Sequence, residues 1–285
     1  MNFLGGRGSA ASFVPAADCL ENEDKMLQFG IFAWFSYPLP IAERLKLIQE
    51  AGFDAVSLWW GDENEDEKER QPALARKLGL AIDNIHAPYP NANALWQDGL
   101  AGEAYLRLLC SCIDDCRQHG IPTVVAHISR LSIQPEVTPI GVARIKCLVE
   151  HAEKREINLA IENLNCIPHL DRIFAQLDSE RLGFCYDSGH ENFNHPDADC
   201  LARYGHRLFA VHLHDNAGDA DAHLLPYDGN IEWESVKQKL KKCRPIPYLT
   251  LEVDFKREHP QSCLYQGLSA EQFLSQAYLR LQRLS

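Results

Sequence analysis

Histidine and carboxylate residues are concentrated in one stretch of the sequence, between residues 211 and 223. It reads Val-His-Leu-His-Asp at 211–215 and Asp-Ala-His at 221–223. In a β-strand, His212 and His214 would point to the same face, because side chains alternate along a strand. Imidazole and carboxylate groups at this density are typical ligands of a divalent transition metal. The simpler alternative for this stretch alone is one buried, hydrogen-bonded histidine beside surface polar residues.

Short apolar runs alternate with amphipathic stretches eight times after residue 26. The predicted strands cover residues 27–33, 53–59, 80–86, 123–128, 158–163, 182–187, 208–215 and 248–254. The predicted helices cover residues 41–51, 66–78, 101–119, 139–155, 167–177, 196–204, 233–241 and 270–284. Strands that alternate with helices form parallel sheets, and eight such units indicate a closed barrel. We therefore predict an α/β fold, with a flexible extension at residues 1–25 and a single (β/α)₈ TIM barrel at 26–285.

In such barrels the chemistry lies at the C-terminal ends of the strands. Six predicted strands carry a histidine or an acid near that end: His86, His127, Glu162, Asp187, His212 and Glu252. Alternation places Glu162, Asp187 and His212 on the inward face of their strands. Clustered carboxylates would raise each other's pKa unless a cation lay among them. The set therefore predicts a metal site at one rim of the barrel.

Seven short motifs resemble the xylose isomerase-like TIM barrel superfamily. They are Ala-Gly-Phe-Asp at 51–54, Asn-Ile-His-Ala-Pro at 84–88, Ile-Glu-Asn at 161–163, Tyr-Asp-Ser-Gly-His at 186–190, His-Leu-His-Asp-Asn at 212–216, Asp-Ala-His at 221–223 and Leu-Glu-Val at 251–253. That superfamily contains sugar and sugar-phosphate isomerases and epimerases, inosose dehydratases and endonuclease IV. The resemblance extends from residue 27 to the C-terminus.

The resemblance to the sugar isomerases implies one divalent ion, held by Glu162, Asp187, His212 and Glu252, with His214 as an alternative to His212. It also implies that Glu162 and Glu252 act as acid and base, and that His190 orients the substrate. Sites that contain imidazole suit Mn, Co, Zn or Fe. Such an enzyme would isomerise or epimerise a sugar, sugar phosphate or keto-sugar through an enediolate that the metal stabilises. A dehydratase, or lyase, is a close variant, because it begins from the same enolate.

The resemblance to endonuclease IV implies a different site, with three zinc ions that cleave abasic DNA. Its additional ligands correspond to His86, His127, His190, Asp221 and His223, which could instead bind substrate. The acidic run at 62–67 would repel a DNA backbone, and no basic stripe is evident. A small-molecule carbohydrate is therefore favoured over nucleic acid, and a multi-zinc phosphodiesterase is the alternative function. A barrel that only binds sugar is disfavoured by the complete acid/base set.

Aromatic residues follow several of the predicted strands. Stacking on the apolar face of a sugar is predicted for Trp34, Trp59, Trp60 and Trp96. Lys256, after the eighth strand, is predicted to bind a phosphate or carboxylate of the substrate. Ordinary loop packing is the alternative for each tryptophan, and a surface role is the alternative for Lys256.

The overall composition limits the class of protein. A hydrophobic content of 46% supports a large core, and a net charge of −12 disfavours general binding to nucleic acid or membranes. No apolar run approaches the ~20 residues that span a bilayer. The first 25 residues lack a signal-peptide pattern, and the ten cysteines form no Cys-x-x-Cys pair, so we expect reduced thiols in a cytoplasmic protein. Analogy with other barrels suggests a homodimer.

Overall fold

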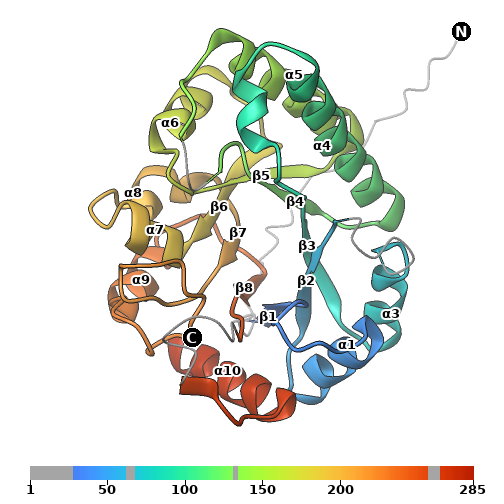
Figure 1. Ribbon diagram of the computed structural model, residues 1–285, viewed down its shortest axis with the longest axis vertical. Helices are drawn as coiled ribbons and strands as arrows, with labels where there is room; N and C mark the ends of the chain where they lie inside the picture. The colour runs from blue at the N-terminus through green and yellow to red at the C-terminus, as the bar shows by residue number, and fades with distance from the viewer. Residues whose placement is uncertain (1–27, 62–67, 131–133, 256–263) are drawn as a thin grey trace, which may run out of the picture.

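The structure is a computed structural model that describes residues 28–61, 68–130, 134–255 and 264–285. The predicted extension at 1–25, the acidic run at 62–67 and Lys256 lie outside the described residues. In Figure 1 the strands lie toward the centre of the molecule and the helices surround them. No disulfide joins any two of the cysteines within the described ranges. Over the same ranges, no helix combines the length and the apolar character that are needed to cross a bilayer.

Eight parallel strands form the wall of a barrel: β1 (Gln28–Phe32), β2 (Ala55–Trp59), β3 (Ala81–His86), β4 (Thr123–Ala126), β5 (Asn158–Glu162), β6 (Leu182–Asp187), β7 (Leu208–His212) and β8 (Tyr248–Leu251). Hydrogen-bonded neighbours follow the order β7-β6-β5-β4-β3-β2-β1-β8. The gap between β7 and β8 is bridged just beyond the end of β7. There the Leu213 amide donates to Thr250 O over 2.9 Å, and the Glu252 amide donates to Leu213 O over 3.1 Å. The predicted single-domain TIM barrel is confirmed.

The helices that cover the barrel are α1 (Ile41–Glu50), α3 (Gln71–Lys77), α4 (Leu100–His119), α5 (Pro139–Arg155), α6 (Ile167–Gln176), α7 (Ser188–Asn194), α8 (Cys200–Tyr204), α9 (Trp233–Leu240) and α10 (Ala270–Leu284), with 3₁₀ turns η1 (Ala92–Trp96) and η2 (Gly205–Arg207). The helix predicted at 196–204 is the shorter α8. No helix was predicted where α7 begins, directly after β6. It forms there because the Asp187 carboxylate accepts a hydrogen bond from the His190 amide and so caps the first turn.

Apolar side chains form two separate clusters, one inside the barrel and one between the strands and the helices. The inner cluster consists of Val125, Ala160, Cys185, Phe209 and Ala210. The outer core includes the alternate residues of the same strands, among them Ile161, Phe184 and Val211. The alternation predicted for β5, β6 and β7 is therefore confirmed, and it directs the last residue of each of these strands into the barrel.

Candidate metal centre

The ends of six strands bring the predicted site residues to one rim of the barrel. The last residues of β3, β5, β6 and β7 and the first residues after β4 and β8 lie there: His86, Glu162, Asp187, His212, His127 and Glu252. All are buried except Glu252, whose side chain is 14% exposed. Six polar side chains thus lie together at the C-terminal face of the barrel, where the active sites of TIM-barrel enzymes lie.

The central group consists of Glu162, Asp187, His212 and Glu252. Each of these residues offers one ligand atom, and the four atoms lie within 4.8 Å of one another. Nδ1 of His212 lies 3.1 Å from Oε2 of Glu162 and 2.7 Å from Oε2 of Glu252. The structure therefore brings together the four residues predicted to hold one ion, and His212, not His214, is the histidine in this group.

A second group shares Glu162 with the first. Nε2 of His86 lies 3.4 Å from Oε2 of Glu162, and Nε2 of His127 lies 3.3 Å from the same oxygen. These three residues also have ligand atoms within 4.8 Å of one another. One carboxylate oxygen is thus surrounded by nitrogen atoms from β3, β7 and the residue that follows β4.

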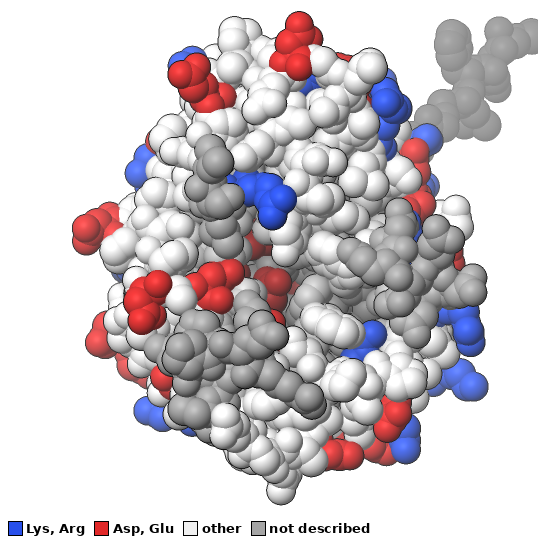
Figure 2. All heavy atoms as spheres, viewed as in Figure 1, with Lys and Arg blue, Asp and Glu red and all other residues white. Residues whose placement is uncertain are grey.

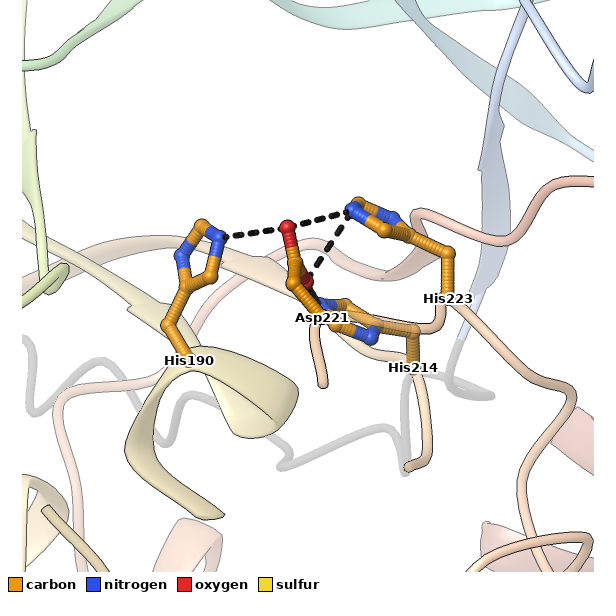
Figure 3. Close-up of side chains that lie close together, drawn as sticks. All are labelled: His190, His214, Asp221 and His223. Carbon is orange, nitrogen blue, oxygen red and sulfur yellow. Dashed lines mark hydrogen bonds and ion pairs between the residues drawn. The ribbon is translucent and has the colours of Figure 1, made fainter. Parts of the chain in front are cut away.

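A third group contains His190, His214, Asp221 and His223 (Figure 3). The Asp221 carboxylate lies between the rings of His190, 3.6 Å from its Nε2, and His223, 3.2 Å from its Nε2. His190 also places Nδ1 3.0 Å from Oε1 of Glu162. The third group is therefore connected to the central one through His190.

Many buried ligand atoms in these groups approach one another without hydrogen-bond geometry. Among the described residues, both carboxylate oxygens of Glu162, both ring nitrogens of His127 and of His212, and Oε2 of Glu252 form no hydrogen bond. Buried polar atoms are otherwise almost always paired, because leaving one unpaired costs about 1–3 kcal/mol. Ligand atoms that are gathered within 4.8 Å of one another and have no hydrogen bond are what a metal ion requires. The donor set of two or three carboxylates with imidazoles fits a divalent ion.

The carboxylates and the imidazoles of the central group shift each other's pKa in opposite directions. Burial alone would raise the pKa of Glu162, but His127 and His212 outweigh it and hold that pKa well below its usual value. Burial would also raise the pKa of Glu252, but His212 outweighs burial and lowers that pKa. For His212, burial would lower the pKa, yet Cys185, Glu252 and Glu162 raise it well above the ordinary histidine value. Both glutamates are thus ionised at neutral pH.

The third group shows the same opposition of charges. The pKa of His190 is raised well above its usual value, because Asp187 and Asp221 more than offset the effect of burial. Burial would raise the pKa of Asp221, but His223 and His190 lower it strongly. The negative charges of the site are therefore balanced by protons on histidine, which a cation would replace.

Asp187 is held by its neighbours on both its backbone and its side chain. The Asn163 side chain accepts from the Asp187 amide and donates to the Asp187 carbonyl, each over 2.8 Å. The His190 amide donates to Oδ1 of Asp187 over 2.6 Å. The Ile-Glu-Asn and Tyr-Asp-Ser-Gly-His motifs thus form one hydrogen-bonded unit that orients this carboxylate.

The loop that carries Asp221 and His223 is organised by Asp215. Its buried carboxylate accepts from the Tyr227 amide, from the Ile231 amide and from Nε1 of Trp233, over 2.9, 3.2 and 2.7 Å. Asp215 therefore has no place in the three groups of ligands. Its function in the Val-His-Leu-His-Asp stretch is to close the loop.

A cavity of about 270 Å³ opens above the groups. Its described lining residues are His86, Tyr89, His127, Arg130, Glu162, Leu164, His190, Asp221, His223 and Glu252. In Figure 2 acidic side chains lie at a hollow near the centre of this face, and basic side chains are scattered without forming a stripe among the residues that are coloured. Tyr89 and Arg130 lie in the segments that follow β3 and β4, and this position after a strand end is the signal in the sequence that indicates them.

The four tryptophans predicted to bind substrate have different environments. Trp59 is half-buried beside His86 and Tyr89, with ring centroids 5.5 and 5.6 Å away, so it lies next to the cavity. Trp34 is exposed beneath the Arg44 guanidinium and is not among the described lining residues.

Trp60 and Trp96 were predicted to stack on the substrate, but the structure places both in the core. Both are 1% exposed. The Trp60 indole donates to Asp115 over 2.7 Å, and the Trp96 indole donates to the carbonyl of Ile128 over 2.6 Å. Their rings are directed into the layer between strands and helices, where a substrate has no access.

Comparison with known proteins identifies the family. The model of the xylose isomerase-like TIM barrel family matches residues 45–266. The uncharacterized protein y4fM of Sinorhizobium fredii is 28% identical over 248 residues, which cover 72% of this chain and 78% of that protein. A solved fusion protein of a xylose isomerase-like TIM barrel with a 4-hydroxyphenylpyruvate dioxygenase is similar to this chain, with a TM-score of 0.71. This chain covers 42% of the length of that fusion protein.

Solved single-barrel proteins have the same fold at low sequence identity. The D-psicose 3-epimerase from Clostridium cellulolyticum H10, solved with D-tagatose, is 13% identical with a TM-score of 0.74, over 90% of this chain and 98% of its own. The IOLI protein, solved with a zinc atom, is 16% identical with a TM-score of 0.73 and the same coverage. The resemblance noted in the sequence is confirmed by the family match, which spans most of the chain. The protein belongs to the xylose isomerase-like TIM barrel family.

Proposed function

We propose that the protein is a divalent-metal-dependent isomerase or epimerase of a small sugar or keto-sugar. The observation that carries this proposal is that Glu162 and Glu252 both lie within 3.1 Å of one nitrogen of His212. Both carboxylates also line the cavity. Similarity to a fold that includes solved sugar epimerases supports it.

The central group would hold the ion through Glu162, Asp187, His212 and Glu252. A divalent ion bound there supplies a positive charge that stabilises negative charge on the carbonyl and hydroxyl oxygens of a sugar. The proton transfers belong to the protein's own carboxylates. Because the pKa values of Glu162 and Glu252 are lowered, both are ionised and able to accept a proton.

One glutamate would remove the proton from the carbon beside the carbonyl and release it to solvent, while the other, after taking up a proton from solvent, would deliver that proton to the opposite face of the carbon. This exchange inverts the carbon, and return of the proton to the neighbouring carbon gives the isomer. His190, whose Nδ1 lies 3.0 Å from Glu162, would orient a substrate hydroxyl against the base. Loss of hydroxide from the same enolate would give the dehydratase variant.

The cavity suits a small polyhydroxylated molecule. Its volume of about 270 Å³ is just below the range of roughly 300–1,000 Å³ that is typical of pockets for larger ligands. Histidines, carboxylates and Arg130 provide most of its lining, while Tyr89 and the neighbouring Trp59 offer apolar ring faces for sugar C–H groups.

The test is exchange of substrate hydrogen with solvent. A panel of ketopentoses, ketohexoses, their phosphates and keto-cyclitols is incubated in D₂O with protein loaded with Mn²⁺, Co²⁺ or Zn²⁺. Metal-dependent incorporation of deuterium beside the carbonyl, seen by ¹H NMR, is the expected result. The proposal fails if no member of the panel exchanges with any of the three ions while bound metal is present.

A specific observation favours a second candidate, a multi-metal phosphodiesterase that acts on abasic DNA. His86 and His127 form a further group with Glu162, and His190, Asp221 and His223 lie in another. Three ions on one chain, with cleavage of an abasic duplex, would establish this function. The scattered basic side chains of the face in Figure 2 disfavour it, because a duplex is bound mainly through its phosphates.

A further inference from the structure

We propose that His214 is a positioning residue of the metal centre and not one of its ligands. It holds the carboxylate of Asp187 by a hydrogen bond and supports the ring of His223 by stacking. This inference rests on the proposed metal centre. It gives a role to the second histidine of the 212–216 motif, whose part in metal binding the sequence left open.

The geometry of two rings excludes His214 and His223 as ligands of the same ion. They lie face to face, with centroids 4.0 Å apart and planes inclined by 7° (Figure 3). An imidazole nitrogen binds a metal through a lone pair in the plane of its ring, at about 2.0–2.1 Å for zinc. Two stacked, nearly parallel rings have no point at that distance that lies in both planes. At most one of the two rings could therefore be a ligand of an ion placed beside Asp221.

His223 is the ring with the geometry of a ligand. Its Nδ1 lies 2.7 Å from the carbonyl oxygen of Glu252. A carbonyl oxygen only accepts, so this nitrogen carries the hydrogen. The other nitrogen, Nε2, lies 3.2 and 3.3 Å from the two oxygens of the Asp221 carboxylate, so this nitrogen and that carboxylate are placed side by side for an ion. A backbone carbonyl that holds one ring nitrogen is the usual arrangement behind a metal-binding histidine.

His214 has the opposite arrangement. Its Nε2 lies 3.0 and 3.1 Å from the two carboxylate oxygens of Asp187, but 3.7 Å from Asp221. Nε2 of His214 is thus directed at the carboxylate of Asp187 and not at Asp221, and the hydrogen bond between them fixes the direction of the Asp187 carboxylate. Both side chains are 0% exposed, so water does not compete for this hydrogen bond.

The first turn of α7 is shaped around the ring of His214. Oγ of Ser188 donates to the His214 carbonyl over 2.7 Å and accepts from its amide over 3.0 Å. Gly189 lies against the ring, and a Cβ atom at that position would overlap it. Asp187, Ser188 and Gly189 therefore each contact His214 in a different way. The Asp-Ser-Gly sequence and His214 form one interlocked unit that fixes the direction of the Asp187 carboxylate.

The experiment separates the hydrogen bond from the stacked ring. Metal-free wild-type protein and its variants are titrated with Co²⁺, followed by the visible absorption of the bound ion, and the ratio of Co to protein is measured after desalting. H214F retains a ring against His223 but lacks the N–H donor. H214Q loses the ring but places an amide N–H near the position of Nε2. H169F is the matched control, since His169 is also buried but packs on Trp96 outside the three groups.

Loss of a residue that hydrogen-bonds a metal ligand typically lowers metal affinity about 10–100-fold. H214F should therefore bind Co²⁺ about 10–100-fold more weakly than wild type, with shifted absorption bands. The affinities of H214Q and H169F should stay within about threefold of the wild-type value. All variants should retain the wild-type ratio of Co to protein at saturation. His214→Met is the second donor-free variant, should H214F not fold.

Two results would overturn the assignment. Unchanged affinity and bands in the donor-free variants would show that the hydrogen bond positions nothing. Loss of one Co²⁺ per chain in H214Q, or a loss of affinity equal to that of H214F, would make His214 a ligand. A wild-type protein that binds no Co²⁺ would instead refute the proposed metal centre itself, so the two failures are distinguishable.

Discussion

Nδ1 of His212 lies 2.7 Å from Oε2 of Glu252, and the two residues stand at the ends of adjacent strands, β7 and β8. In the metal-free protein this is an ion pair between an imidazolium and a carboxylate, because the pKa of the histidine is raised and that of the glutamate is lowered. A metal ion bound between them takes the place of the proton. Metal binding and protonation therefore compete at this contact.

The first prediction concerns pH and stability. The raised pKa values of His212 and His190 stabilise the metal-free fold below the ordinary histidine value of about 6.5, and this contribution is lost as pH rises through the folded-state values. The lowered pKa values of Glu162, Glu252 and Asp221 stabilise the fold at neutral and alkaline pH, and this stabilisation is lost only when the pH falls into the acid range. Metal-free protein should therefore be less stable at pH 8.5 than at pH 6.

Metal-loaded protein should not show this alkaline loss, because the ion has already displaced the protons. One pKa unit corresponds to about 1.4 kcal/mol, and about 1 kcal/mol shifts Tm by roughly 2–4 °C in a domain of 150–250 residues. The gap in Tm between loaded and metal-free protein should widen by at least a few degrees from pH 6 to pH 8.5. Thermal melts at both pH values measure it, and a constant or narrowing gap contradicts the prediction.

The second prediction concerns Glu162 as acid or base. Removal of such a group typically costs about 10²–10⁴-fold in rate, so Glu162→Gln should lower kcat by at least about 10²-fold. The variant keeps the shape of the side chain, and its circular dichroism should match wild type. Glu150→Gln, on the exposed side of α5, is the matched control and should retain full activity. Turnover by a metal-replete Glu162→Gln protein at the wild-type rate would remove this residue from the mechanism.

The third prediction concerns the number of ions. Dialysis against a chelator should abolish turnover and lower Tm, and one equivalent of Mn²⁺, Co²⁺, Zn²⁺ or Fe²⁺ should restore both. Elemental analysis of the purified protein should find about one ion per chain, held by the central group. A value near three, with cleavage of an abasic duplex, would favour the phosphodiesterase.

The fourth prediction concerns Gly189. Alanine is the better helix former by about 1 kcal/mol, so Gly189→Ala in α7 would stabilise the protein if packing were unaffected. Because the added Cβ overlaps the His214 ring, we expect the opposite, a lower Tm and weaker Co²⁺ binding. In Gly189→Ala/His214→Ala the clash is absent, so the double variant should bind no more weakly than His214→Ala alone. Additive losses would show that the two positions are independent.

The fifth prediction distinguishes two adjacent tryptophans. Trp59 lies beside the cavity, so Trp59→Ala should raise KM with a modest change in Tm. Trp60 is buried and bonded to Asp115, and a core Trp→Ala substitution costs about 3–5 kcal/mol, so Trp60→Ala should lower Tm strongly. Melting curves and steady-state kinetics measure both. The reverse pattern would contradict the placement of these rings.

The fold and the central group could be predicted because they depend on local rules. Alternation along a strand decides which side chains enter the barrel, and parallel strands all end at the same rim. Glu162, Asp187 and His212 follow from these two rules. The order of strands and helices was also predictable, because few other strongly apolar runs in the sequence compete with the eight that form strands.

The directions of residues beyond the strand ends could not be predicted in this way. The run at 208–215 was expected to continue as a strand, which would point His214 like His212. Regular pairing in β7 ends at His212, although Leu213 and Asp215 still form single bridges with Leu251 and Leu224, and the His214 ring reaches Asp187, a contact that alternation alone does not specify. Trp60 follows Trp59 in an extended run, and its amide still bonds to β3, so alternation could have placed its ring on the outer face. Trp96 lies in the 3₁₀ turn η1, where alternation gives no guide. The cytoplasmic location, the homodimer and the role of residues 1–25 stay predictions.

The bonds of Asp215 have a consequence for the cooperativity of folding. Its carboxylate ties residues 227, 231 and 233 to the end of β7, so the loop that carries Asp221 and His223 is anchored at both ends to the barrel wall. Such a segment does not open by itself as a lid would; it unfolds with the strands that hold it. The loop is therefore preorganised, and the amide hydrogens of Leu224, Tyr227 and Ile231, which are hydrogen-bonded to Asp215, should exchange with solvent nearly as slowly as those of the barrel core.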